Sequence, residues 1–358
     1  MGVVCLARRI DGGFEQQVAI KFARVGLSAE HIRRFSAERD ILARLKHPGI
    51  AHLYGGGVSD GRPYLVMEYV EGRSITTFCK EESLSVEQRV DLIMAVCDAV
   101  QYAHQNLVIH RDLKPSNMLV TGEGQVKLLD FGIAKLLRAD QGEAAPLTSP
   151  ALTPGYSSPE QLRNDVVTTA SDVFSLGVTA YELLAGERPF AVRGLSAAQV
   201  ERLVGETDPA PPSQLAKKNR LASVDEDLDK IVMRALRKEP SERYESARAL
   251  ANDFKRHLRG LPVVARTPTR TYRTLKFVRR NRVAVTSVLV GLSILLAGVS
   301  STVWQAQLAS QRAEEAARER DNAQAAADRA EKINAFLQGV LATANPSWYV
   351  DSELNGPG

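Results

Sequence analysis

The chain has 358 residues and a formal net charge of +4, with 46 basic and 42 acidic side chains. A chain of this length and ordinary apolar content can bury a large core, so the composition argues against intrinsic disorder. Its three cysteines, Cys5, Cys79 and Cys97, are far apart in the sequence. That spacing excludes a disulfide framework and a paired-cysteine metal site.

The residue pattern changes from strand-like to helical along the first 260 residues. β-branched runs predict strands at 3–8, 18–23 and 63–70, around one helix at 28–45. Later segments predict helices at 86–104, 169–186 and 225–258, short strands and turns over 108–132, and a polar loop over 139–160. A small sheet-rich part followed by a larger helical part predicts an α+β fold.

Residues 283–303 contain twenty-one residues without a charge. As a helix this stretch would cover about 30 Å, the thickness of bilayer hydrocarbon, so it predicts one transmembrane helix. Residues 265–282, just before it, hold seven basic and no acidic side chains. This bias predicts a cytoplasmic N-terminal part and a C-terminus outside the inner (plasma) membrane. Because the basic excess is confined to this flank, no nucleic-acid partner is expected.

After the span, residues 305–341 are rich in Ala, Glu, Arg and Gln and predict a solvated helix. Its large apolar side chains fall on one stripe, which consists of Ile333, Phe336, Leu337, Val340 and Leu341.

Two short motifs carry the chemistry: HRDLKPSN at 110–117 and DFG at 130–132. Phosphoryl transfer requires a carboxylate to accept the proton of the attacking hydroxyl, ligands for a metal ion, and positive charge on the phosphates. These roles suit five residues, which are Asp112, Asn117, Asp130, Lys114 and Lys21. Each alone would be an ordinary polar loop residue, but the whole set in this order predicts phosphoryl transfer.

With these motifs, residues 1–258 closely resemble the Hanks-type, eukaryotic-like serine/threonine protein kinases of bacteria. The resemblance implies a two-lobed protein kinase fold, ATP with Mg²⁺ or Mn²⁺ as cofactors, and Ser/Thr hydroxyls of proteins as substrates. Lys21, in VAIK, would pair with Glu38 of the following helix. Lys114 and Thr153 match the serine/threonine pattern, which disfavours tyrosine kinases.

The resemblance also assigns the nucleotide site. Met67 would be the gatekeeper, and the backbone of residues 68–70 would receive adenine. The full expected ATP-binding set is Gly2, Val4, Ala19, Lys21, Met67, Glu68, Val70, Asn117 and Asp130, of which Asn117 and Asp130 would hold the metal ion.

The resemblance predicts an activation segment that ends at the SPE motif of residues 158–160. Glu160 would form a buried bridge with Arg243, and Asp172 would brace the catalytic loop. Arg111 would bind a phosphate on the segment, with Thr148 and Ser149 as its expected acceptors.

The expected domains are a kinase domain at 1–258, a basic juxtamembrane linker at 259–282, the span at 283–303 and an outer helical segment at 304–358. Gly2 matches only the third glycine of the family's glycine-rich loop. We therefore expect the kinase domain to lack its first strand here. At the other end, relatives with this juxtamembrane run and outer helix often continue into tetratricopeptide repeats.

Three functions remain to be weighed. The first is a transmembrane signalling kinase activated by phosphorylation, which we expect to work as a homodimer. The second is a catalytically weak scaffold that keeps the kinase fold. The third is a small-molecule phosphotransferase. The activation segment that leads to the SPE motif disfavours it, because small-molecule kinases of the same ancestry lack this segment.

Overall fold

The computed structural model describes residues 3–10, 15–22, 29–59, 61–131, 154–267 and 269–343, without the side chains of residues 9, 29–34, 38 and 342–343. It forms two units, Met1–Arg280 and Asn281–Gly358. Each unit is described here by itself.

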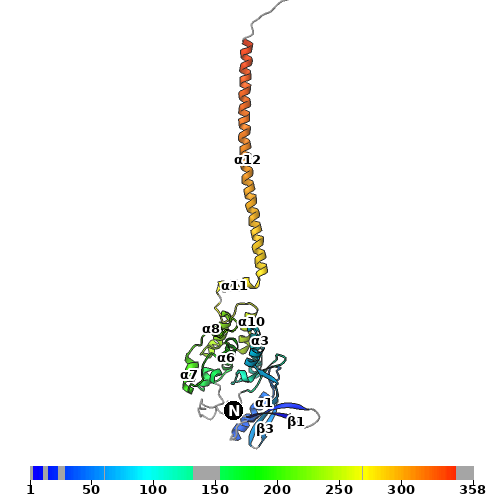
Figure 1. Ribbon diagram of the computed structural model, residues 1–358, viewed down its shortest axis with the longest axis vertical. Coiled ribbons are helices and arrows are strands. Elements are labelled where there is room, and N and C mark those ends of the chain that lie inside the picture. The colour runs from blue at the N-terminus through cyan, green and yellow to red at the C-terminus, as the bar shows by residue number, and fades with distance from the viewer. Residues whose placement is uncertain are drawn as a thin grey trace, which may run out of the picture. The chain divides into compact units, whose positions relative to one another are not determined.

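The first unit begins with a small antiparallel sheet (Figure 1). Its strands are β1 (Val3–Arg9), β2 (Gln16–Phe22), β3 (Leu53–Ser59) and β4 (Arg62–Glu68), in the spatial order β1-β2-β4-β3. Helix α1 (Ala29–Leu42) packs on β3 and β4, where Phe35, Leu53 and Leu65 form a compact apolar cluster. The tight turn between β3 and β4 contains Gly61 at φ +72°, a conformation that glycine adopts without a Cβ clash.

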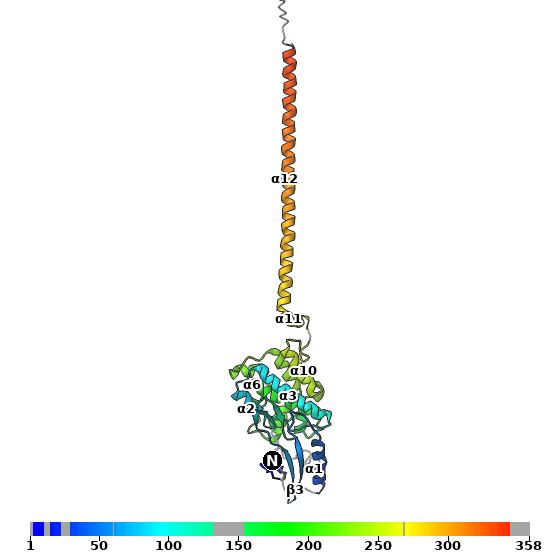
Figure 2. The ribbon, with the colours of Figure 1, turned by 90° about the vertical axis from the view of Figure 1, so that its right-hand side faces the viewer.

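The larger lobe of this unit is helical. Its longer helices are α3 (Val86–Gln105), α6 (Thr169–Ala185), α7 (Ala197–Glu206), α9 (Glu226–Ala235) and α10 (Ala247–Leu258). Its short elements are α2 (Ile75–Glu81), η1 (Pro115–Asn117), η2 (Pro154–Tyr156), α5 (Pro159–Leu162), α8 (Pro212–Lys218) and η3 (Pro240–Glu242). Figure 2 shows α3 beside α10, and these two helices make extensive contact.

Helix α6 lies at the centre of this lobe, against α3, α8, α9 and α10. Nearly all of its residues are buried, as expected for a helix that is apolar on every side. Gly177 permits the close approach of α9, because a Cβ at that position would lie 2.8 Å from the Cβ of Ala235. The helix ends at Gly186, whose φ of +79° forms a left-handed cap.

A second small sheet, in the order β5-β6-β7, is formed by Gly72–Ser74, Met118–Thr121 and Val126–Leu128. Two of its strands connect the sequence motifs: β6 follows the HRDLKPSN motif directly, and β7 leads into the DFG motif.

The expected helices at 86–104 and 169–186 agree closely with α3 and α6. The single helical stretch expected over 225–258 is instead two helices, α9 and α10, separated by η3. Pro240 begins η3, and a proline disrupts the hydrogen bonding of a continuous helix. The segment expected as a linker at 259–282 contains a further helix, α11 (Arg270–Arg280).

The second unit is dominated by α12 (Arg282–Thr343), one helix of 62 residues. The sequence suggests a span and a separate outer helix, but the structure joins them without a break. Residues 299–338 include neither proline nor glycine, so no helix-breaking residue separates the two parts. Among the described residues, α12 is the one helix long and apolar enough to cross a membrane, and none of its most apolar window is buried.

Candidate active site

The HRDLKPSN loop is held by one buried carboxylate at the start of α6. Asp172 is 1% exposed, and its two oxygens accept the backbone N–H groups of His110 at 2.8 Å and Arg111 at 2.9 Å. Arg111 has a φ of +66°, an unfavourable conformation for a residue with a Cβ. The two hydrogen bonds hold the backbone in this conformation and thereby fix the direction of the residue that follows, Asp112.

The buried His110 links this loop to the DFG motif. Its Nε2 lies 2.9 Å from the carbonyl oxygen of Leu129, and its Nδ1 lies 3.3 Å from the backbone N of Asp112. Burial lowers the pKa of His110, which favours the neutral ring. A neutral ring with its proton on Nε2 satisfies both contacts, so His110 joins the two loops without adding charge.

Asp112 is surrounded by two other residues of its own motif. Lys114 Nζ lies 2.7 Å from Oδ2 of Asp112, and Asn117 Nδ2 donates to the Asp112 backbone carbonyl at 2.8 Å and to its Oδ2 at 3.2 Å. The Lys114 side chain is 8% exposed and that of Asp112 is 19% exposed. A carboxylate held between a cation and an amide is restricted to one orientation.

Lys21 and Asp130 meet across the two lobes. Lys21, on β2, places its Nζ 2.9 Å from Oδ1 of Asp130, which follows β7. Both side chains are about a quarter exposed. The side chain of Glu38, the expected partner of Lys21, lies outside the described residues, and so does Gly132 of the DFG motif.

The strand register brings together four of the expected nucleotide-binding residues. Val4 pairs with Lys21 on the neighbouring strand, and Ala19 pairs with Met67. Because cross-strand partners share a face and side chains alternate along a strand, all four lie on the same face of the sheet. Gly2 lies outside the described residues.

Glu68 makes a contact that the sequence did not indicate. Its backbone N–H donates to the carbonyl of His52 at 2.8 Å, and its carboxylate binds Lys127 at 2.7 Å and the N–H of His52 at 3.0 Å. This carboxylate therefore ties the end of β4 to β7 in the other lobe. The Glu68 N–H is already used, which limits what this residue can offer to adenine.

The structure places Glu160 and Arg243 in a buried bidentate ion pair. The two oxygens lie 2.7 and 2.8 Å from Nη1 and Nη2, and the side chains are 4% and 0% exposed. Arg243 also donates to the carbonyls of Ala170, Arg237 and Lys238. Burial raises the pKa of Glu160, but hydrogen bonds from Arg243 and Ser171 outweigh it and hold that pKa at about 2.

Gln161, next to this pair, reaches back to the catalytic loop. Its Nε2 donates to the carbonyl of Arg111 at 2.8 Å, and its Oε1 accepts the N–H of Ser158. Sequence reasoning missed Gln161, because one glutamine in a short helix carries no distinctive signal. The expected Thr148, Ser149 and Thr153 lie outside the described residues.

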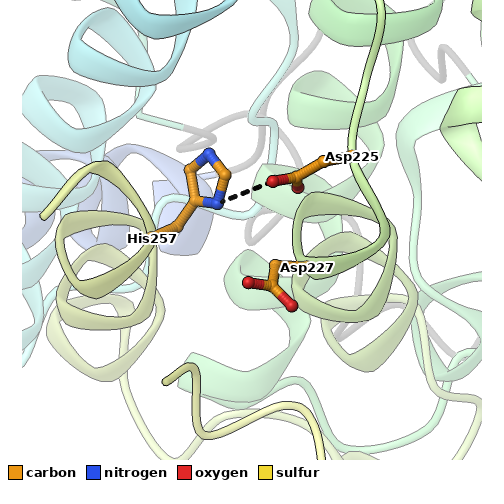
Figure 3. Close-up of side chains that lie close together, drawn as sticks. All are labelled: Asp225, Asp227 and His257. Atoms are coloured by element: carbon orange, nitrogen blue, oxygen red, sulfur yellow. Dashed lines mark ion pairs between the residues drawn. The ribbon is translucent and has the colours of Figure 1, made fainter. Parts of the chain in front are cut away.

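One group of three potential metal ligands occurs within the described ranges, away from these motifs: Asp225, Asp227 and His257 (Figure 3). Asp227 already binds Lys276 at 2.6 Å and Arg266 at 3.3 Å, so its charge is compensated without a cation. The residues expected to hold the metal ion are instead Asp130 and Asn117, whose carboxylate and amide oxygens are ligand types that Mg²⁺ prefers.

Comparison with known proteins places these features in context. Residues 1–255 match the family model described as "Protein kinase domain". The chain is 36% identical over 269 residues to serine/threonine-protein kinase PknB of Mycobacterium leprae, and 34% identical over 244 residues to serine/threonine-protein kinase PrkC of Bacillus subtilis. These matches cover 73% and 67% of this chain but only 42% and 36% of the two relatives.

Among solved structures, the chain is similar to the kinase domain of PknI from Mycobacterium tuberculosis, with 28% identity and a TM-score of 0.53. The match covers 70% of this chain and 89% of that one. The two lobes described above therefore form a protein kinase fold, with a β-rich N-terminal lobe and a helical C-terminal lobe.

The Glu160–Arg243 pair generates a prediction about stability. The pKa of Glu160 is depressed from its ordinary 4.5 to about 2, so its stabilisation is fully present above pH 4.5 and is lost as the pH falls towards 2. The shift corresponds to roughly 3 kcal/mol. Glu160→Gln leaves Arg243 buried without its counter-charge, and we expect a loss of about 3–5 kcal/mol at neutral pH and a flatter profile below pH 4.5.

Chemical denaturation of the kinase lobes across this pH range measures both effects. The matched control is Glu206→Gln, which removes an exposed carboxylate paired with Arg202 and should change little. An acid-dependent loss of stability in Glu160→Gln as steep as in the parent would show that another carboxylate is responsible.

Proposed function

Because the chain belongs to the protein kinase domain family and is a bacterial Hanks-type serine/threonine protein kinase, we propose that it transfers phosphate in transmembrane signalling, with Asp112 as its catalytic base. One observation carries the assignment of the base. The Asp112 carboxylate lies between Lys114 and Asn117, on a loop whose backbone is fixed by Asp172.

In this proposal the Asp112 carboxylate orients a Ser or Thr hydroxyl of a protein substrate and accepts its proton. Lys114, 2.7 Å away, stabilises the ionised carboxylate before the reaction and offsets negative charge during it. Asn117 Nδ2 donates to Asp112, which prevents the carboxylate from rotating away. These three side chains supply orientation and charge, the two contributions that phosphoryl transfer needs most.

Membership of this family implies the use of ATP and a divalent metal ion, and the residues present suit both. We assign the metal ion, Mg²⁺ or Mn²⁺, to Asp130 and Asn117. Because Asn117 Nδ2 donates a hydrogen bond to Asp112, its Oδ1 is the atom that would coordinate the cation. When bound, the ion would neutralise phosphate charge. Lys21, already 2.9 Å from Asp130, would contact the phosphates from the sheet, on the face that it shares with Val4, Ala19 and Met67.

We further propose that the enzyme is activated by phosphorylation of its activation segment at Thr148 or Ser149, with Arg111 binding the new phosphate. Arg111 belongs to the rigid loop that Asp172 holds, and its carbonyl accepts from Gln161, just beyond the segment's end. A phosphate bound there would join the segment to the catalytic loop through charge-assisted hydrogen bonds.

The membrane part of the proposal rests on α12. Its residues 283–303 form an uncharged helical stretch of bilayer length, preceded by the basic run of 265–282. The proposed domains are therefore a kinase domain at 1–258, a juxtamembrane segment at 259–282, a membrane span at 283–303 and an outer segment at 304–358. The kinase domain would lie in the cytoplasm.

The first prediction of this proposal concerns Asp112. Asp112→Asn keeps the hydrogen bond with Asn117 possible but removes the proton acceptor, so phosphorylation of a protein substrate should fall by about 10²–10⁴-fold. Transfer of labelled phosphate by the full chain in detergent or vesicles measures this. Asp91→Asn, at an exposed position of α3, is the matched control and should keep full activity. Activity of Asp112→Asn equal to that of the control would remove Asp112 from the mechanism and favour the scaffold hypothesis.

The second prediction concerns topology. A reporter enzyme that is active only outside the cytoplasm should give a signal when it is fused after residue 341 and none when fused after residue 262, because the Lys/Arg-rich side of the span stays in the cytoplasm. Expression levels of the two fusions, compared by immunoblot, provide the control. A signal from the fusion at 262 alone would reverse the proposed orientation.

The third prediction concerns pairing of two copies, which we propose as the way a single span carries a signal. Small residues four apart, Ser287 with Gly291 and Ser293 with Ala297, permit close approach of two helices. Phosphorylation at Thr148 or Ser149 per molecule should then rise with protein density in vesicles. Gly291→Leu should weaken this dependence, whereas Val290→Leu should not. A rate per molecule that is constant over a wide range of density would exclude reaction between copies.

A further inference from the structure

The peptide unit between Arg111 and Asp112 sets the direction in which the proposed base points. Its N–H, which belongs to Asp112, donates to the carbonyl of His110 at 2.9 Å. Its carbonyl, which belongs to Arg111, accepts a hydrogen bond from Nε2 of Gln161 at 2.8 Å. Because a peptide unit is planar and rotates only as a whole, a rotation would break both hydrogen bonds. The two contacts therefore fix the peptide plane from which Asp112 extends.

The backbone at Arg111 requires this support. Its φ of +66° lies in a region that is unfavourable for a residue with a Cβ. Asp172 holds the peptide unit before Arg111, through its N–H at 2.9 Å, and Gln161 holds the peptide unit after it. With both units fixed, Arg111 cannot relax to an ordinary conformation, and the direction of Asp112 is preserved.

Gln161 is itself held in one orientation. Its Oε1 accepts the N–H of Ser158 at 3.1 Å while its Nε2 donates to Arg111. A flipped amide would place two donors together at Ser158 and two acceptors together at Arg111, so both contacts select the same orientation. The preceding residue, Glu160, is locked in its buried ion pair with Arg243. The donor to the catalytic loop is therefore fixed in position as well as in orientation.

A helix-capping role alone does not account for the contact with the catalytic loop. The same Ser-x-x-Gln pattern begins α3 and α7, where Gln88 accepts the N–H of Ser85 and Gln199 accepts the N–H of Ser196, both at 2.8 Å. Those two glutamines are exposed and cap helices of 20 and 10 residues. Gln161 is half-buried, begins a helix of four residues, and reaches a carbonyl 50 residues earlier in the chain.

We propose that Gln161 is a positioning residue for the catalytic base: through the carbonyl of Arg111, it holds the carboxylate of Asp112 in the orientation that phosphoryl transfer requires. This inference rests on the proposed role of Asp112. It also makes the alignment of the base depend on residues 158–161, the end of the expected activation segment. The base is then aligned only when that end of the segment is folded in place.

The test begins with two substitutions in the full chain. Gln161→Met has a similar size and removes both hydrogen bonds, whereas Gln161→Glu keeps the oxygen that accepts from Ser158 and loses the donor to Arg111. Both should lower kcat for a protein substrate by about 10-fold. The KM for ATP should change by less than about twofold, because the expected ATP-binding residues are unaltered. Gln88→Met, which removes the equivalent capping amide of α3, is the matched control and should keep the parent's kcat.

A double-mutant cycle tests whether Gln161 acts through the base. If it does, Gln161→Met combined with Asp112→Asn should transfer phosphate at about the rate of Asp112→Asn alone, because residues that act as a unit do not have additive effects. Chemical denaturation of each variant gives the folded fraction to which its rate is normalised. Gln161→Glu, which retains the cap, keeps the experiment decisive if Gln161→Met is unstable.

Two results would reject the positioning role and leave Asp112 as the base. One is a further 10-fold loss in the double variant, which would show that Gln161 acts independently of Asp112. The other is a kcat of Gln161→Glu equal to that of the parent, which would show that the contact with Arg111 has no part in the reaction. Full activity of Asp112→Asn would instead reject the proposed base itself, and this inference with it.

Discussion

The whole catalytic arrangement depends on a buried carboxylate, that of Asp172. A charge at 1% exposure is costly unless hydrogen bonds compensate it, and here they come from the backbone of His110 and Arg111 and from the ring of His104. The free energy released by satisfying this charge holds Arg111 in its left-handed conformation. From there the order spreads outward: His110 contacts Leu129, and Leu129 N donates to the carbonyl of Asn117. A chain of hydrogen bonds therefore links Asp172 to the proposed base, Asp112, to Asn117 and to Leu129, the residue before Asp130.

One turn of α6 holds both sides of the site. Asp172 supports the catalytic loop, whereas its neighbour Ser171 donates to Glu160 at 2.7 Å and Ser175 donates to the carbonyl of Tyr156 at 2.8 Å. The last two contacts fix the end of the expected activation segment. Because α6 is buried on every side, a shift of this turn would disturb the packing of the whole lobe. This buried helix thus positions both the loop proposed to do the chemistry and the end of the segment proposed to control it.

The sequence predicted the site residues that belong to short motifs, because a motif depends only on residue type and spacing. It did not predict contacts between common residues that are far apart in the sequence. Short motifs identified Asp112, Lys114, Asn117 and Asp130, because few other proteins place these residue types at this spacing. Nothing in the local pattern around Lys127 indicates its ion pair with Glu68, 59 residues away. Similarly, the basic run of residues 265–282 predicted a membrane flank, but it did not reveal that Lys276 points inward to Asp227. That orientation is set by Asp227, whose burial depends on the packing of α9.

The unbroken course of α12 has a mechanical consequence. A helix of 62 residues measures about 90 Å, of which the uncharged stretch uses about a third. Since no proline interrupts it, the azimuth of the stripe from Ile333 to Leu341 is locked to the azimuth of residues 283–303. Rotation of the Thr343 end about the helix axis therefore rotates the Arg282 end in the same sense. A bend or a flexible joint would dissipate such torque, and the continuous hydrogen-bond ladder preserves it.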